Sequence, residues 1–481
     1  MIPQVLDTSV CCRPFPAMTA DLTRRTLLRL GGATALALLG LDRRFAAEPP
    51  AAGLLPVGFG PLVADPAGVL DLPAGFRYVV VSRTGDAMAD GLLVPGAPDG
   101  MACFAGVDGT LRLVCNHELR PEHAKVGAFG ADQARFANID RARVYDAGDG
   151  MRPALGGTTT MIVDAASGAC RKQWLSLAGT WNNCAGGPTP WGSWITCEEA
   201  TQRVGTTDAG VLVARDHGYA FEVPAAADGL VEPLPLTAMG RFRREAIAVD
   251  PASGAIYQTE DAKDGVFYRF LPTQPGHLRA GGRLQALRIR GYAKPDTTNW
   301  KAKDIAVGRE LAVDWVDVAD PSDRTAAQAT AAGAHIFTRG EGCWYDHGVV
   351  WFACTDGGAA FKGQIWRYQP SAVEGTPAER EQPGRLTLFV EPDDGALLEN
   401  VDNITVAPWG DVLGAEDNAS PGSSPENRLI GITPSGAIYP LVSTTLSEIA
   451  GPCFSPDGRW LFLNIQAGVT IAVTGPWPKR P

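Results

Sequence analysis

Short strand-like segments joined by glycine-containing turns recur along this chain, and this repetition limits the possible folds more than any other feature. The turns are VDAASG (163–168), VDPASG (249–254), ITPSG (432–436) and FSPDG (454–458). In each turn the glycine supplies the positive φ that a tight hairpin needs. The chain has 56 Gly and 37 Pro but only 20% charged residues, which suits many short strands better than long surface helices. We therefore expect an all-β fold.

A second pattern repeats at longer, irregular intervals: an apolar, alternating strand that ends in polar or acidic residues. It occurs at 113–118 (LVCNHE), 194–199 (WITCEE), 256–261 (IYQTED), 351–356 (WFACTD), 412–417 (VLGAED) and 462–466 (FLNIQ). Hairpins recurring at spacings of roughly 50 to 95 residues are typical of propeller blades with variable insertions. The segments 317–332 and 371–382 are expected insertions, the first with a short helix around 324–332. Residues 48–481 are thus predicted to form one β-propeller domain.

The first 47 residues have the pattern of an export signal rather than of a folded segment. Residues 23–29 (TRRTLLR) contain a twin arginine, and the weakly apolar run 30–41 follows it. That run is too short for a stable membrane anchor. We predict that residues 1–47 are a twin-arginine signal peptide, with Met18 as an alternative start, and that the protein is periplasmic or secreted. The alternative is a disordered or helical N-terminal tail.

The charge balance of the remaining chain bears on its partners. Without the six Arg and three Asp of residues 1–47, it carries 36 basic and 50 acidic residues, a formal net charge of −14. An acidic surface disfavours nucleic acid and anionic membranes, and it fits a protein whose carboxylates hold cations. Eight cysteines remain, of which Cys103 with Cys115 and Cys343 with Cys354 lie across expected hairpins. Pairing of these thiols after export is an open alternative to free cysteines.

In a propeller, the acidic strand ends would lie close together. The innermost strands of a propeller run side by side around a central channel, so groups at equivalent strand ends converge on one mouth. Several carboxylates there repel one another unless cations lie between them, and Ca²⁺ takes six to eight oxygen ligands. The sequence therefore predicts one cation site at the channel. The alternative is a set of unrelated strand ends with solvated carboxylates.

Two further residues refine this prediction. Cys184 would add a thiolate, a poor ligand for Ca²⁺ but a good one for a transition metal, so a mixed site would hold two kinds of metal. Its alternative role is that of a small buried hydrophobe. Arg339 and Glu341 are two apart, which on a strand places them on one face, where a metal-bound carboxylate beside a guanidinium would accommodate phosphate. The alternative there is a local ion pair.

Several short motifs together resemble a known family. They are CNHE (115–118), NCAGG (183–187) through TCEE (196–199), GRF (240–242) with Glu245, TED (259–261), Arg339 with Glu341, and DNIT (402–405) with Glu416 and Asp417. With them the chain resembles the PhoX-type alkaline phosphatases, exported bacterial phosphomonoesterases built as six-bladed propellers. The resemblance spans most of the chain after the leader.

The resemblance implies a buried cluster of Fe³⁺ and Ca²⁺ ions that binds the phosphate of small phosphate esters. It implies Cys184 as an iron ligand with Glu199, Glu245 and Glu341, and it places Glu118, Glu260 and Asp402 nearer calcium. Glu198, Asp261 and Glu416 are further candidate ligands, although strand alternation points only one of Glu198 and Glu199 inward. Arg339 would contact the phosphoryl group, and the attacking oxygen would be metal-bound. The chain has Arg244 where family members often have His.

Two other functions compete with this interpretation. A calcium-dependent lactonase or phytase-like propeller also surrounds its channel with carboxylates but needs no thiolate, so iron content discriminates. A non-catalytic propeller that binds a partner at its face would show no metal-dependent turnover. We expect a monomeric enzyme that has the twin-arginine export machinery as its partner and binds no nucleic acid.

Overall fold

Antiparallel strands make up most of the regular structure in this computed structural model, which describes residues 57–418 and 424–478. The only α-helix in these residues is α2 (Thr325–Ala331), at the position expected from the sequence; the other helical turns are 3₁₀. No helix in the described ranges is long and apolar enough to cross a membrane. The predicted signal peptide, residues 1–47, lies outside the described residues, and Val57–Pro481 cluster as one compact unit.

The larger sheets follow one another in chain order. The first contains β4 (Pro98–Ala105), β5 (Thr110–His117), β6 (Gly156–Asp164) and β7 (Cys170–Thr180), and the second contains β8 (Asn183–Pro188), β9 (Ser193–Glu198) and β12 (Ala220–Pro224). A nine-stranded sheet has the order β13 (Arg244–Val249), β14 (Ile256–Glu260), β15 (Tyr268–Pro272), β16 (Gly282–Ile289), β17 (Glu310–Asp317), β21 (Arg385–Val390), β20 (Gln364–Gln369), β19 (Val349–Cys354) and β18 (Gly340–Asp346).

Two four-stranded sheets complete the arrangement. One contains β22 (Val401–Val406), β23 (Val412–Glu416), β24 (Asn427–Ile432) and β25 (Ile438–Thr444). The other contains β26 (Ile449–Phe454), β27 (Leu461–Ile465), β28 (Val469–Thr474) and β3 (Arg77–Arg83). Because β3 comes from the start of the described chain, its pairing with β28 ties the two ends of the fold together. Two two-stranded pairs, β1 (Leu62–Val63) with β2 (Leu72–Pro73) and β10 (Thr207–Asp208) with β11 (Val211–Leu212), lie outside these sheets.

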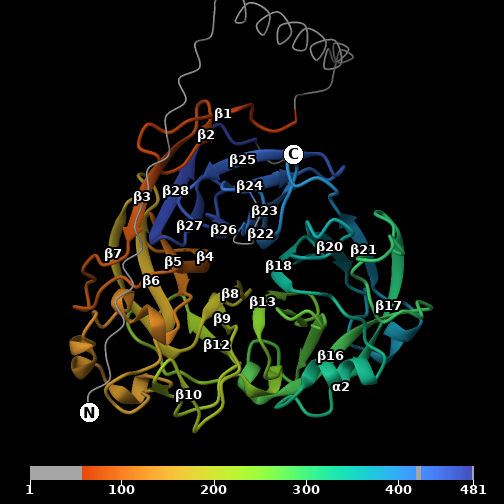
Figure 1. The fold of residues 1–481 in the computed structure, drawn as a ribbon, viewed down its shortest axis with the longest axis horizontal. Coiled ribbons are helices and arrows are strands. Elements are labelled where there is room, and N and C mark those ends of the chain that lie inside the picture. The colour runs from red at the N-terminus through yellow and green to blue at the C-terminus, as the bar shows by residue number, and fades with distance from the viewer. Residues whose placement is uncertain (1–56, 419–423, 479–481) are drawn as a thin grey trace, which may run out of the picture. The chain divides into compact units, whose positions relative to one another are not determined.

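The innermost strands converge on a common centre, which we call the hub. Strand β4 contacts β8, β8 contacts β13, and the series continues through β18, β22 and β26 back to β4 (Figure 1). A narrow cavity between them is lined by residues of all these strands, including Gly100, Ala185, Ala246, Gly342 and Gly451. The all-β, propeller-like arrangement expected from the repeats is therefore present.

Apolar and aromatic side chains hold neighbouring parts of the ring face to face. Phe267 stacks on Phe352 with ring centroids 4.1 Å apart, and Trp366 is buried in the same cluster. This cluster joins strands β13–β17 to strands β18–β21 of the nine-stranded sheet, so the two halves pack as layers. Buried aromatic surface of this kind is the main stabilising contribution in such a fold.

The described cysteines are all free thiols. Cys103 lies opposite Leu113 rather than Cys115, and Cys343 lies opposite Phe352. The register therefore places neither suggested pair directly across its hairpin, and neither disulfide is present.

Candidate metal centre

One backbone arrangement recurs where each innermost strand begins. The first residue after the neighbouring strand donates its N–H to the carbonyl of the residue that precedes the innermost strand, at distances of 2.9 to 3.1 Å. The donor and acceptor pairs are Glu118 with Ala97, Glu199 with Asn182, Asp261 with Arg243, Thr355 with Arg339, Asp417 with Asn400, and Gln466 with Glu448. We call the donors strand-end positions and the acceptors rim positions. The repeated bond allows residues of different sheets to be matched position by position.

Side chains that could bind a metal lie two residues after the rim positions. These hub positions are Asp99, Cys184, Glu245, Glu341, Asp402 and Ala450. The register of the innermost strand shifts at or directly after each of them, as in a β-bulge. Because a bulge redirects side chains out of the regular alternation, it can aim the same position of every innermost strand at the hub. Five of these six positions carry a thiol or a carboxyl group.

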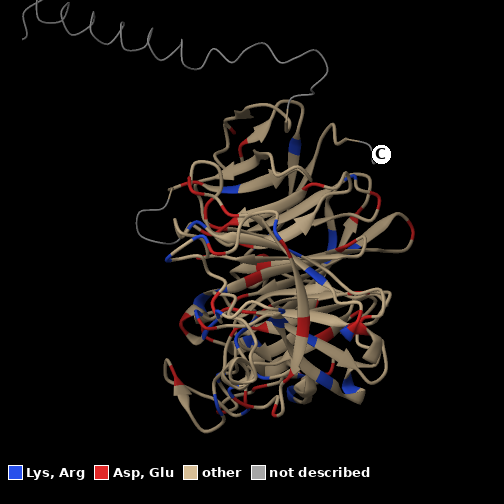
Figure 2. Cartoon of the chain, turned by 90° about the vertical axis from the view of Figure 1, so that its right-hand side faces the viewer, with Lys and Arg blue, Asp and Glu red and all other residues tan. Residues whose placement is uncertain are grey.

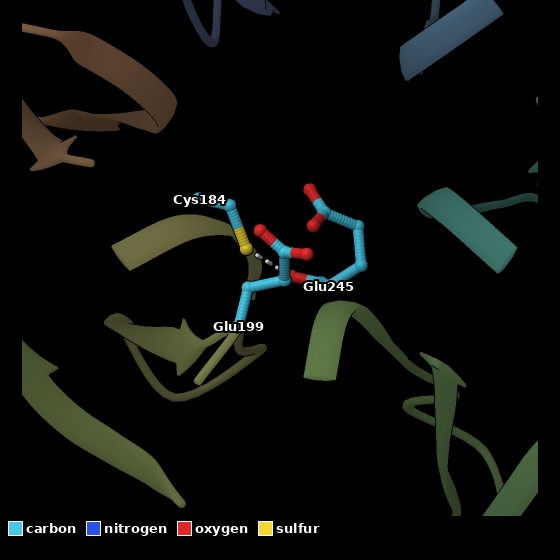
Figure 3. Close-up of side chains that lie close together, drawn as sticks. All are labelled: Cys184, Glu199 and Glu245. Atoms are coloured by element: carbon cyan, nitrogen blue, oxygen red, sulfur yellow. Dashed lines mark hydrogen bonds between the residues drawn. The ribbon is translucent and has the colours of Figure 1, made fainter. Parts of the chain in front are cut away.

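The hub side chains form two overlapping groups of potential ligands. One ligand atom from each of Cys184, Glu199 and Glu245 lies within 4.8 Å of the others, and the same holds for Glu245, Glu341 and Asp402. Glu245 therefore belongs to both groups. Figure 3 shows the Cys184 thiol and the carboxylates of Glu199 and Glu245 directed toward one another. A shared carboxylate between adjacent groups is the arrangement expected for a cluster of ions rather than for a single ion.

The electrostatics of this centre indicate missing positive charge. Burial, and then the neighbouring carboxylates, raise the pKa values of Glu245 and Glu341 well above their usual range. Burial likewise raises the pKa of Asp402 to about 7 and that of Glu199 to about 8. One buried carboxylate oxygen of Glu245, Oε1, accepts no hydrogen bond from the described residues. A buried carboxylate oxygen without a partner is costly, and so are several buried carboxylates close together. A bound cation would offset both costs, so these residues fit a metal site.

Arginines surround the carboxylates on one side. Arg339 donates from Nε to Asp261 Oδ1 (2.8 Å) and from Nη2 to Glu341 Oε1 (2.6 Å). Its backbone is left-handed, with φ of 44°, as it also is at the rim positions Ala97, Asn182 and Asn400, so this conformation belongs to the repeated start of the innermost strands. Burial alone would raise the pKa of Asp261. Its hydrogen bonds with Glu199 and Arg339 favour the ionised carboxylate and outweigh burial, so the pKa is lowered. The guanidinium of Arg339 thus lies directly beside the carboxylate cluster.

A sequence profile described as alkaline phosphatase PhoX matches residues 57–468, which is most of the chain. The chain belongs to the PhoX alkaline phosphatase family. Its activity is accordingly the hydrolysis of phosphate monoesters.

Comparison with solved structures supports the fold of this PhoX-family member. The chain is similar to PhoX of Pseudomonas fluorescens in complex with vanadate, a transition-state analogue, with 16% identity, a TM-score of 0.64, and coverage of 85% of this chain and 96% of that one. A gluconolactonase of Xanthomonas campestris matches with 13% identity and a TM-score of 0.37 over 87% of this chain and 98% of that one. No curated protein matches significantly.

Three predicted ligands of the PhoX-family chain are held by protein donors instead of joining the two groups. Glu198 accepts from the N–H groups of Trp181 (2.9 Å) and Gly218 (2.8 Å) and pairs with His217 (2.6 Å). Glu260 accepts from the Tyr268 hydroxyl at 2.7 Å, and Glu416 pairs with Arg428 at 2.7 Å. All three are the last residue of their strand, one before a strand-end position, so alternation turns them away from the hub.

The remaining predicted residues lie at the hub or beside it. The structure brings together five of them: Cys184, Glu199, Glu245, Glu341 and Asp402. Asp261 accepts a hydrogen bond from Arg339. Glu118 and Asp99 both accept from the side-chain amide of Gln466. Arg244 is fully buried on the other side of its strand, where it donates to Gln258 and to backbone carbonyls and lies 4.1 Å from the ring centroid of Phe242. Its guanidinium therefore contributes to packing rather than to the cluster of carboxylates.

Two acidic residues of the centre were missed by sequence reasoning. Asp99 is 2% exposed and has one oxygen, Oδ1, that accepts no hydrogen bond in the described part of the chain. Burial and nearby carboxylates raise the pKa values of both Asp99 and Glu448 well above their usual range. Neither residue follows an alternating strand, the pattern that predicts the acidic strand ends. Asp99 is identified as a hub position by the register of β4 against β5, which only the folded hairpin defines.

Proposed function

We propose that this alkaline phosphatase works through a mixed centre of Fe³⁺ and Ca²⁺ at the hub and that Arg339 binds the phosphoryl group of the substrate. The single observation that carries this proposal is the grouping of the Cys184 thiol with Glu199 and Glu245, while Glu245 is also grouped with Glu341 and Asp402. A thiolate selects a transition metal, whereas an all-oxygen group suits a hard cation such as Ca²⁺. One group contains a thiol, the other contains only carboxylates, and Glu245 belongs to both. This difference in ligand atoms favours two kinds of ion.

The proposed iron ligands are Cys184, Glu199, Glu245 and Glu341. Glu245 and Glu341 also belong to the all-oxygen group with Asp402, and they would lie between the iron and the calcium ligands. Asp402 and Glu118 are assigned to calcium. Asp99 joins them because its Oδ1 accepts no hydrogen bond in the described part of the chain and because the carboxylates of Glu118 and Asp402 lie near it. Glu198, Glu260 and Glu416 are assigned supporting roles, since their carboxylates already accept hydrogen bonds from protein donors. When bound, the ions would neutralise phosphoryl charge and make a water molecule more acidic.

The protein's own contribution to the reaction is orientation and charge. The Arg339 backbone N–H donates to the carbonyl of Ala262 at 2.8 Å, which fixes the residue in its left-handed conformation. Asp261 and Glu341 hold the guanidinium from two sides. A planar fork held in this way can donate to two phosphoryl oxygens and stabilise the charge that develops as the ester oxygen departs.

We also propose that the ring has six blades. The nine-stranded sheet then counts as two blades joined through the pairing of β17 with β21. The proposal is supported by the backbone bond between strand-end and rim positions, which occurs once for each of β4, β8, β13, β18, β22 and β26. The protein is further proposed to be a monomer that is exported by the twin-arginine route to the periplasm or beyond. Positive and negative residues are interspersed in the view of Figure 2, and the acidic net charge of the chain disfavours nucleic acid as a partner.

Elemental analysis of the purified protein combined with an assay on a chromogenic aryl phosphate tests the proposal. We expect iron and calcium to co-purify with the protein and turnover to fall after calcium chelation and return when calcium is restored. Cys184→Ser should lose iron in preference to calcium. Protein that contains no iron and is fully active would contradict the mixed centre, and metal-loaded protein without phosphatase activity would contradict the function.

A further inference from the structure

Arg243 occupies the same position as Arg339 in the neighbouring part of the ring. Both are rim positions: the Arg243 carbonyl accepts from the Asp261 N–H and the Arg339 carbonyl accepts from the Thr355 N–H, each at 3.0 Å. Arg243 stands two residues before Glu245, as Arg339 stands two residues before Glu341. The fold therefore presents two guanidinium groups from matched positions of adjacent innermost strands.

The two guanidinium groups are joined by one carboxylate. Asp261 accepts from Arg339 Nε through Oδ1 at 2.8 Å and from Arg243 Nη2 through Oδ2 at 3.0 Å. Arg243 Nη2 also contacts Glu199. On the other side of Glu199 lies Arg120, whose Nη2 is 3.9 Å from Glu199 and 3.8 Å from Glu118. Arg120, Arg243 and Arg339 thus form a row of three cations along the border of the hub.

This row has more cationic donors than one phosphoryl group requires. A phosphate monoester presents three non-ester oxygens, and the ions of the hub and Arg339 are already assigned to them. The Arg339 side chain is 31% exposed, whereas those of Arg243 and Arg120 are each 46% exposed. Arg243 also keeps Nε and Nη1 free of hydrogen bonds to any described residue. Its free donors accordingly lie beside the phosphoryl site and are open to solvent.

We propose that Arg243, flanked by Arg120, forms a second anion subsite that selects phosphate monoesters whose leaving group carries a further carboxylate or phosphate. This inference rests on the proposed function, because it needs Arg339 to hold the ester phosphate. Charge favours an anion as the ligand. The row contains three arginines, and cations bound at the hub would engage Glu199 and Glu341, two of the carboxylates that neutralise them. The guanidinium fork matches carboxylate and phosphate geometry equally well.

Arg243 has one competing role, namely neutralising Glu199 and Asp261 without touching substrate. The two roles differ in their effect on substrates. Neutralisation alone affects every ester alike, because it acts through the metal centre. A substrate contact affects an ester with an anionic leaving group more than an ester of the same size with an uncharged leaving group.

The test compares 3-phosphoglycerate with glycerol 3-phosphate, which has a hydroxymethyl group in place of the carboxylate, using the metal-loaded enzyme at fixed ionic strength. We expect the native enzyme to favour 3-phosphoglycerate in kcat/KM. In Arg243→Gln that preference should fall by about tenfold, mainly through KM, because one charge-assisted hydrogen bond is lost. Arg243→Lys should retain part of the preference. The matched control is Arg171→Gln on the outer strand β7. Its exposed side chain pairs with Asp164 at the end of β6, and its substitution should leave the preference unchanged.

The outcomes separate this inference from the proposed function. Equal losses on both substrates in Arg243→Gln, with unchanged metal content and melting temperature, would overturn the second subsite and assign Arg243 to neutralisation. A native enzyme that hydrolyses both esters without preference would also overturn it while leaving the phosphatase function intact. Hydrolysis of neither ester, nor of the aryl phosphate, by metal-loaded protein would overturn both.

Discussion

Glu198 and Glu199 are consecutive, yet their carboxylates serve opposite sides of one strand end. Glu198 Oε1 lies 2.6 Å from His217 Nδ1 among protein donors, whereas Glu199 lies within 4.8 Å of Cys184 and Glu245 at the hub. Both side chains are buried, so burial alone does not distinguish them. The distinction comes from alternation: Glu198 is the last residue of β9 and Glu199 is the first residue beyond it.

The substitutions Glu198→Gln and Glu199→Gln should therefore have different effects. Glu199→Gln should reduce bound iron and phosphatase activity and change the stability of the metal-free protein little. Glu198→Gln should lower the free energy of unfolding by about 2 to 4 kcal/mol, because it leaves a charged network with His217 buried and incompletely paired. Metal analysis and denaturant unfolding of metal-free protein check both expectations. Loss of iron in Glu198→Gln at native stability would contradict this division of roles.

Arg339→Ala should lower kcat/KM for an aryl phosphate by about a hundredfold or more while metal content stays near native, because the residue stabilises charge on the phosphoryl group. Arg339→Lys should recover little of the loss, since a point charge does not replace the planar fork. Steady-state kinetics and elemental analysis on the same preparations provide the measurement. Arg171→Ala on the outer strand β7 is the control. Native kinetics in Arg339→Ala would remove the assigned role.

His217 makes the stability of the fold depend on pH. Burial lowers the pKa of its imidazole, but Glu198 and Asp146 outweigh this effect and raise it from 6.5 to about 9. A raised native-state pKa means that the charged histidine contributes stability fully below pH 6.5 and that this contribution is lost as the pH rises toward 9. The difference in unfolding free energy between native protein and His217→Gln should therefore shrink over this range. A difference independent of pH would contradict the charged Asp146–His217–Glu198 network.

The sequence predicts the propeller-like fold well and the site only in part. The repeated strands are visible in the sequence, but the side of the strand that each carboxylate faces is not. Alternating strands with acidic ends located Glu118, Glu199 and Asp261 because each stands next to its strand end. The same pattern also selected Glu198, Glu260 and Glu416, because a one-residue shift reverses the side that a side chain faces. Asp99 carries no such signal, since its orientation depends on the register of a bulge in β4 against β5, which only the folded hairpin defines.

Glu245→Gln should separate stability from function most clearly. The Glu245 carboxylate has an unpaired buried oxygen and lies close to Glu341 and Asp402, so without metal its charge opposes folding. We expect Glu245→Gln to bind iron and calcium weakly and to have little activity, but to melt at a higher temperature than the native protein when both are metal-free. Burial raises the native-state pKa of Glu245 well above its usual range. The charged carboxylate therefore destabilises the fold more as the pH rises, and the gain in stability of Glu245→Gln should be larger at pH 9 than at pH 6.

With metals added, the order of stability should reverse, because only the native protein gains the binding free energy. Glu310→Gln, an exposed glutamate on β17, is the matched control and should follow the native protein in every condition. Thermal unfolding with and without chelator at both pH values decides the matter, and a Glu245→Gln protein less stable than native in the metal-free state would show that the carboxylate is held by the fold rather than by ions.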